Sequence, residues 1–245
     1  MIKESLEISN YDNLILFGGF IDDFYNRFPN IKSFDKNIFL ISPINFDYHP
    51  NITHFSYEVL YDEYVACLLA YFLSPTFKTK YASLDIGYLS SESNLSEEEL
   101  EQISLSTNGK KSLIILGGDI YKSNVADNII RAFNFILSEE NFDVAFLDSK
   151  KANNNEQTID EITEIQDDIN GLVAYIRYDD EMRLEGSNQF ALVGKVTNGD
   201  MISLNMDTKE LKVKFVLNPK LRGLIGMLFS DIKFESCYYK TTIKR

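Results

Sequence analysis

Two short stretches decide the fold: Asn13–Gly19, which reads NLILFGG, and Ser112–Asp119, which reads SLIILGGD. Each is a continuous apolar run closed by a glycine pair, without the polar alternation of a half-exposed strand. Runs of this length are typical of strands that are buried on both faces, as in parallel sheets. Apolar residues at helical spacing follow each run. The sequence therefore predicts two strand–turn–helix units of a parallel sheet.

The helix after the second run has the clearer pattern, and we expect it to begin near Ser123. Its apolar residues recur on one helical face: Val125, Ile129, Phe133, Ile136 and Leu137. The first glycine pair precedes a shorter stripe of the same kind: Ile21, Phe24, Tyr25 and Phe28. Both glycine pairs are thus predicted to join a strand to a helix.

Other segments extend this layer. Asn37–Ser42 and Asp143–Leu147 are apolar enough for two more strands. Val59–Leu73 is apolar nearly all round and predicts a helix that is buried on several sides. A further helix begins at Ser96, because Ser96 and Glu99 form a capping box. The strand–helix alternation predicts an α/β fold whose mostly parallel sheet is flanked by helices.

The predicted secondary structure changes after Ser149–Thr158, a polar stretch that predicts a loop or linker. Beyond it we expect strands at Leu172–Ile176, Phe190–Val196, Met201–Leu204 and Leu211–Leu217. Asn198-Gly199-Asp200 is predicted to form a hairpin turn between two of these strands. Leu224–Phe229 and the C-terminal tail could add more. The expected domains are an α/β lobe over residues 1–150 and a smaller β-rich part over residues 151–245, packed on the first.

Composition excludes several classes of function. The chain has 245 residues, with 24 Lys and Arg against 37 Asp and Glu, a formal charge of −13. Such an acidic chain repels nucleic acid and anionic lipid, so we expect neither as a partner. The longest apolar run, Val65–Leu73, is less than half of the roughly 20 residues that cross a bilayer. The N-terminus has no secretory signal pattern, and we expect a cytoplasmic protein without direct membrane insertion.

The glycine pairs are the best candidate for a ligand site. Glycines at a strand-to-helix turn let phosphate approach backbone N–H groups, and Asp119 after Gly117-Gly118 could accept a ribose hydroxyl. Neither pair completes a dinucleotide-binding or P-loop motif. Tight turns that pack a helix on the sheet explain the same glycines and are the simpler interpretation.

No other residues form a recognisable catalytic or metal-binding motif. His49 and His54 lack a nucleophile signature nearby, and Cys67 and Cys237 are too few for a thiolate-bound metal or cluster. The acidic clusters are more simply explained as helix termini or solvated turns: Asp22-Asp23, Glu97-Glu98-Glu99, Asp167-Asp168 and Asp179-Asp180-Glu181. We therefore expect no catalytic residue, no metal and no cofactor.

One cluster of cations stands out in this acidic chain, and it comprises Lys209, Lys212, Lys214, Lys220 and Arg222. It is a candidate for contact with a partner protein. The solvated face of a hairpin explains it equally well.

Three parts of the sequence together resemble a known family. They are Asn37–Phe72; Leu84–Ile103 with Ser112–Ile136; and Gly186–Asn205 with Phe215–Leu228. In the same order they resemble the molybdopterin-oxidoreductase-like region of the large iron–sulfur subunit of bacterial NADH:quinone oxidoreductase, respiratory complex I. The resemblance covers about two-thirds of the chain and rests on local strings rather than on a cofactor motif.

This resemblance implies a scaffold rather than a redox centre. The family's cysteine-ligated clusters lie in a ferredoxin-like part that this chain lacks, and the molybdopterin-like region has itself lost its metal cofactor. No catalytic residue is therefore carried over. In some bacteria the NADH-binding subunits of complex I are missing, unrelated chains occupy their gene positions, and a carrier such as flavodoxin is thought to replace NADH.

Two hypotheses follow. The first is a non-redox accessory or docking subunit at the electron-input arm of a complex I-like enzyme, where it would stand in for the missing NADH-binding subunit. It would contact the large iron–sulfur subunit through an apolar face from Val59–Leu73 or Leu224–Phe229, and would lie on the inner face of the membrane through that complex. The second is a stand-alone α/β nucleotide-binding enzyme that uses the Gly117-Gly118-Asp119 turn.

Overall fold

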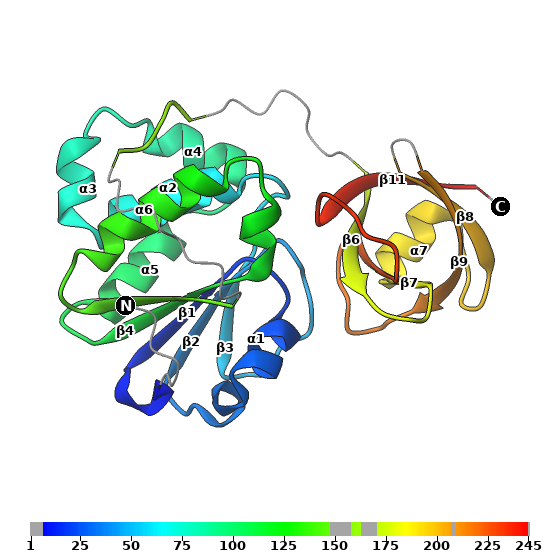
Figure 1. Cartoon of the computed structure of the whole chain (residues 1–245), viewed down its shortest axis with the longest axis horizontal. Coiled ribbons are helices and arrows are strands. Elements are labelled where there is room, and N and C mark those ends of the chain that lie inside the picture. The colour runs from blue at the N-terminus through cyan, green and yellow to red at the C-terminus, as the bar shows by residue number, and fades with distance from the viewer. Residues whose placement is uncertain (1–6, 148–157, 163–170, 207–208, 245) are drawn as a thin grey trace. The chain divides into compact units, whose positions relative to one another are not determined.

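The computed structural model describes residues 7–147, 158–162, 171–206 and 209–244. The chain forms two compact units (Figure 1). The α/β unit comprises Met1–Pro43 and Tyr48–Glu164, and the barrel unit comprises Ile44–Asp47 and Ile165–Arg245. Residues 149–157 of the predicted linker lie outside the described ranges.

The α/β unit is built on a five-stranded parallel sheet in the order β3-β2-β1-β4-β5. Its strands are β1 (Asn13–Phe17), β2 (Asn37–Ile41), β3 (Ile52–Phe55), β4 (Ser112–Leu116) and β5 (Phe142–Phe146). The side chains of β1 and β4 are buried along their whole length. The predicted parallel sheet is therefore confirmed, with the two decisive runs at its centre.

Helices cover both faces of this sheet (Figure 1). Right-handed crossovers place α1 (Ile21–Arg27) on one face, and α2 (Asp62–Leu73), α5 (Glu97–Thr107) and α6 (Ala126–Leu137) on the other. Two shorter helices, α3 (Pro75–Lys80) and α4 (Ile86–Ser93), pack beside α2. Nine of the twelve residues of α2 are buried, which confirms the prediction of a helix buried on several sides.

Two predicted helix starts have different outcomes. The capping box of α5 is present, because Ser96 Oγ accepts from Glu99 N–H and Glu99 Oε2 accepts from Ser96 N–H. The helix expected near Ser123 begins three residues later, at Ala126. A 3-10 helix, η3 (Gly118–Lys122), lies between β4 and this helix.

One strand of the sheet was not predicted. β3 is short and lies at the edge of the sheet, and only Phe55 of its four residues is buried. Its connection from β2 contains no helix. Neither hydrophobic periodicity nor strand–helix alternation could therefore reveal it.

The barrel unit closes six strands in the order β10-β6-β11-β8-β9-β7. They are β6 (Leu172–Tyr178), β7 (Arg183–Gly186), β8 (Met201–Met206), β9 (Lys209–Leu217), β10 (Ile225–Ser230) and β11 (Tyr238–Lys244). Its core includes Leu184, Phe190, Leu204, Phe215 and Leu228. The expectation of a smaller β-rich part after the α/β part is thus confirmed, with the barrel closure as an addition.

The strand predicted at Phe190–Val196 was wrong. The segment forms helix α7 (Asn188–Gly194), which Figure 1 shows across the barrel. Ser187 begins the helix, since its Oγ accepts from Phe190 N–H at 3.0 Å. The Asn198-Gly199-Asp200 turn therefore joins a helix to β8 rather than two strands. An apolar run of this length is ambiguous between helix and strand, and Ser187 was the signal that decides it.

Candidate functional site

The two glycine pairs come together at the carboxyl edge of the sheet. β1 and β4 are adjacent and parallel, so Gly18-Gly19 and Gly117-Gly118 follow them on the same side. Gly117 N–H donates to Phe17 C=O at 2.8 Å. From β1 the strands are added toward one edge of the sheet (β2, β3), and from β4 they are added toward the other (β5). Doubly wound sheets bind nucleotides at such a switch point, which here lies between β1 and β4. The sequence-predicted candidate thus lies at the expected position.

The geometry of these turns leaves little room between them. A Cβ on Gly117 would lie 2.9 Å from Gly18 O and 3.2 Å from Phe17 O, which are backbone atoms. Gly18 and Gly19 have positive φ angles of 72° and 69°, which favour glycine. A Cβ on Gly19 would lie 3.5 Å from Asp119 Oδ2. The glycines thus let the two turns approach each other closely.

The helices that follow these turns are also unlike a phosphate cradle. Gly118 and Asp119 belong to the five-residue 3-10 helix η3, and α6 begins only at Ala126. On the β1 side, α1 has seven residues and no side-chain cap at Phe20. Neither turn leads directly into a long α-helix, whose N-terminal amides would hold a phosphate.

A group of polar and aromatic side chains around His54 lies beside the first glycine turn. Ser42 Oγ donates to Gly19 C=O at 2.7 Å, and His54 Nε2 is 3.0 Å from Ser42 O. The Tyr48 ring packs edge-on against the imidazole of His54, with 4.8 Å between the ring centres. Burial lowers the pKa of His54, so the neutral ring donates to the Ser42 carbonyl. The hydrogen bond directs His54 to backbone, which supports a structural role for this residue.

Two hydrogen-bonded polar pairs involve the first two residues of α2, and the sequence analysis missed them. Tyr57 Oη donates to Asp62 Oδ1 at 2.5 Å, and burial raises the pKa of Asp62. Asn128 Nδ2 donates to Glu63 Oε1 at 2.6 Å, with both residues less than a tenth exposed. Two acids in the first turn of an otherwise apolar helix were the available signal, since buried polar groups require partners.

The predicted cation cluster is divided among several environments. Lys212 and Lys214 are exposed on β9, where they pair in register with Ser203 and Met201 of β8. Lys209 Nζ lies 4.5 Å from the centre of the Phe234 ring. Lys220 is exposed, and Arg222 forms an ion pair with Asp47 at 2.6 Å. Lys212 and Lys214 are thus the members that share one face of a strand.

Formal charge is distributed unequally between the units. Of the 24 basic and 37 acidic residues, the barrel unit contains 12 and 12, and the α/β unit contains 12 and 25. Their formal charges are therefore 12 − 12 = 0 and 12 − 25 = −13. The cations of β9 lie in the neutral unit.

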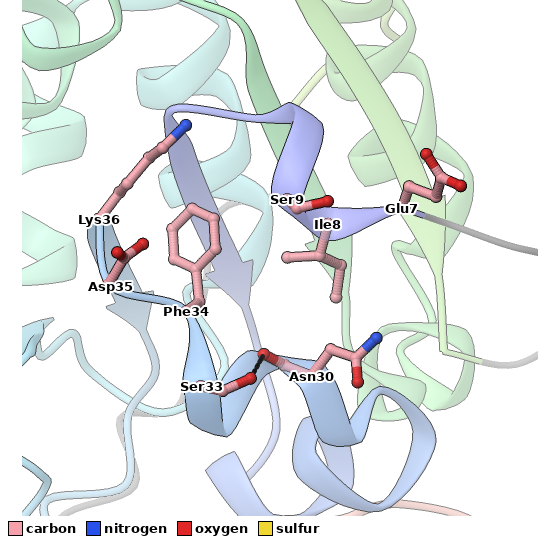
Figure 2. Close-up of a pocket in the computed structure, with 8 residues that line it drawn as sticks. All are labelled: Glu7, Ile8, Ser9, Asn30, Ser33, Phe34, Asp35 and Lys36. Carbon is pink, nitrogen blue, oxygen red and sulfur yellow. Dashed lines mark hydrogen bonds between the residues drawn. The ribbon is translucent and has the colours of Figure 1, made fainter.

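A pocket of about 530 Å³ lies at the opposite, amino edge of the sheet, before β1 and β2 (Figure 2). Ile8 and Phe34 form its buried floor, and Ser9, Asn30 and Asp35 surround it. Lys36 Nζ donates to Tyr11 O at 2.7 Å and Asp12 Oδ1 at 3.0 Å. Doubly wound sheets bind ligands at the carboxyl edge, so this pocket lies away from the expected site.

The cysteines and the acidic clusters are the remaining sequence-predicted candidates. Burial raises the pKa of the Cys67 thiol, and Cys237 is buried as well. Within the described residues, no three His, Cys, Asp or Glu side chains are grouped to hold a metal ion. The Asp167-Asp168 cluster lies outside the described residues. In the same ranges, no helix has the length and apolarity that a membrane span requires.

No known protein family and no curated protein matches this chain.

Proposed function

We propose that the chain is a non-redox accessory subunit at the electron-input, peripheral arm of a complex I-like NADH–quinone oxidoreductase, as its sequence resemblance implies. Its partners would be the large iron–sulfur subunit and other subunits of that arm. The protein would work in the cytoplasm, on the inner face of the membrane through the complex, and would carry no flavin or iron–sulfur cluster of its own.

The observation that supports a scaffold over an enzyme is the contact between the two glycine turns. In nucleotide-binding doubly wound sheets, a pyrophosphate enters between the turns at this position. Here a Cβ on Gly117 would lie 2.9 Å from Gly18 O, and we infer that turns this close leave no room for a pyrophosphate between them. The residues that would approach a cofactor instead stabilise the sheet.

The surface for docking differs from the sequence expectation. Nine of the twelve side chains of α2 are buried in their own unit, so most of Val59–Leu73 is not available for docking. Met227 and Leu228 of the other expected segment are buried too. The exposed apolar side chains of the barrel unit include Leu192, Val193 and Met201, at 79%, 53% and 67% exposure. We propose that Leu192 and Val193 of α7 contact the large subunit, because the burial of exposed apolar surface favours protein association. Met201 is not included, since it lies opposite Lys214 of β9.

The charge distribution gives a role to the cations of β9. An acidic carrier such as flavodoxin would be repelled by the α/β unit at −13. Lys212 and Lys214 on the neutral barrel unit are the described residues of the predicted cluster best placed to steer such a carrier.

The test is affinity purification of the tagged chain from mildly solubilised native membranes, with mass spectrometry of the co-purifying proteins. We expect stoichiometric subunits of the peripheral arm. Leu192→Asp should reduce their recovery, whereas Leu105→Asp on α5, at a similar 75% exposure, should not. A clean monomer in the soluble fraction would contradict the proposal.

A nucleotide-binding protein is the second candidate, because the strand order places both glycine pairs at the switch point of the sheet. Titration with NADH, FMN and ATP distinguishes it from the first. Saturable binding that Gly118→Val abolishes, with the fold intact by circular dichroism, would establish this alternative. Absence of saturable binding would eliminate it.

A further inference from the structure

A five-residue segment, Thr158–Ile162, lies against α3 and α6 of the α/β unit in the manner of a bound peptide. It belongs to no helix or strand, and within the described ranges its backbone forms no hydrogen bond with other backbone groups. Side chains of other elements hold it instead. We call these five residues the docked segment.

The backbone of the docked segment is recognised on both its donor and its acceptor groups. Asp160 N–H donates to Asn128 Oδ1 at 3.0 Å, and Asn128 Nδ2 reaches Asp160 O at 3.4 Å. The preceding amide, Ile159 N–H, donates to Tyr81 Oη at 2.8 Å. Such contacts with the main chain give affinity for an extended peptide whatever its side chains.

Two side chains of the segment are also contacted, and Lys80 Nζ donates to Thr158 Oγ1 at 3.4 Å. Arg131 Nη1 donates to Asp160 Oδ2 at 2.5 Å and to Asn128 Oδ1 at 3.3 Å. The Arg131 side chain is 11% exposed, whereas that of Asp160 is 73% exposed. The arginine thus belongs to the surface of the unit and the aspartate approaches it from outside. This pair selects an acidic residue at the centre of the peptide.

A buried layer fixes the recognising groups. Glu63 Oε1 accepts from Asn128 Nδ2 at 2.6 Å, and the two residues are 3% and 7% exposed. This contact orients the amide so that its oxygen faces the Asp160 N–H. The Asn128 amide is therefore held by the packing of α2 against α6 as well as by the segment.

We propose that Tyr81, Asn128 and Arg131 form a peptide-recognition site for an extended acidic segment of a partner protein, and that the docked segment occupies it in cis. The cis segment has an effective concentration in the millimolar range, as expected for a tethered ligand. It therefore competes with the partner and keeps the site closed until a tighter peptide replaces it. This inference is independent of the complex I proposal.

The test uses the full chain with Asp160→Lys, which turns the docked segment away from Arg131. A fluorescent peptide of residues 156–164, EQTIDEITE, serves as the probe in an anisotropy titration. We expect saturable binding to the variant, and about tenfold weaker binding to the wild-type chain, where the cis segment competes. Asn128→Leu in the Asp160→Lys chain should abolish binding.

A charge exchange gives the matched control. The chain with Arg131→Glu alone keeps Asp160, so its own docked segment is repelled from the site. This chain should lose the acidic probe and bind the same peptide carrying Lys in place of its Asp. This rescue shows that loss of binding is not loss of folding. The proposal is overturned if the Asp160→Lys chain shows no saturable binding up to millimolar peptide. It also fails if binding is equal in all chains, because the contact then serves only to anchor the segment.

Discussion

At the residue scale, Gly117 is where packing alone requires glycine. Its φ of −66° is open to any residue, but an added Cβ would meet Gly18 O at 2.9 Å. We expect Gly117→Ala to destabilise the protein by about 1–3 kcal/mol, as overpacking does. Urea denaturation measures this, with Gly87→Ala in α4 as control, because the nearest atom there is 3.7 Å away. A Gly117→Ala protein as stable as wild type would remove the argument that the turns fill the nucleotide position.

Asp62 gives a pH dependence whose sign is fixed by burial. Its pKa is raised in the folded protein, mainly because the charged form is desolvated, so the folded state binds a proton more tightly than the unfolded state. Stability associated with this group therefore falls as pH rises above the ordinary value of 3.8. Asp62→Asn keeps an acceptor for Tyr57 and removes the charge. We expect its melting temperature to exceed that of wild type at pH 7, and the difference to shrink toward pH 4.

The matched control for this prediction has the opposite sign. The ion pair with Lys36 lowers the pKa of Asp12, so its contribution is present at neutral pH and disappears in acid. Asp12→Asn should lower the melting temperature at pH 7 and have no effect below the folded pKa of Asp12. Thermal melts of both variants from pH 3 to pH 8 check the pair. Parallel curves for Asp62→Asn and wild type would contradict the burial argument.

At the element scale, α7 depends on Ser187. Its Oγ accepts from Phe190 N–H at 3.0 Å and donates to Gly223 O at 2.6 Å. The helix inserts Phe190 into the barrel core, where the ring stacks on Phe215 at 6.2 Å. We expect Ser187→Ala to cost about 1–2 kcal/mol in the free energy of unfolding, as losses of helix caps do. Ser91→Ala on the exposed face of α4 is the control and should change the free energy of unfolding little. Equal losses of stability at the two sites would show that the Ser187 cap does not stabilise α7.

The elements also show what sequence can and cannot predict. Buried parallel strands such as β1 and β4 are apolar after their first residue, so the strands and the parallel type of the sheet could be predicted. The order of the strands in the sheet was not predicted. β3 pairs through its backbone with few buried side chains, and this leaves no apolar pattern. The sequence predicted that each glycine pair follows a strand, but that the two pairs lie together became clear only from the pairing of β1 with β4. The docked segment could not be predicted, since its contacts join Tyr81, Asn128 and Asp160 across distant parts of the chain.

At the scale of the whole molecule, the unequal charge of the two units predicts a salt effect confined to one of them. The α/β unit carries −13 and the barrel unit 0, so self-repulsion opposes folding only in the first. Raising ionic strength from about 0.01 M to about 0.15 M shortens the screening length from roughly 30 Å to roughly 8 Å. We expect hydrogen exchange of amides in β1 and β4 to slow over this range, while that of β8 and β9 stays constant.

Native-state hydrogen exchange resolves the two units within one sample, because each amide reports the opening of its own cooperative region. The comparison of β1 with β8 contains its own control, since both strands meet the same salt at the same time. Sodium sulfate should be avoided because it also strengthens apolar burial, which would protect both units. Equal slowing in sodium chloride would mean that the two units open together. Slowing confined to the barrel would show that net charge does not limit the stability of the α/β unit.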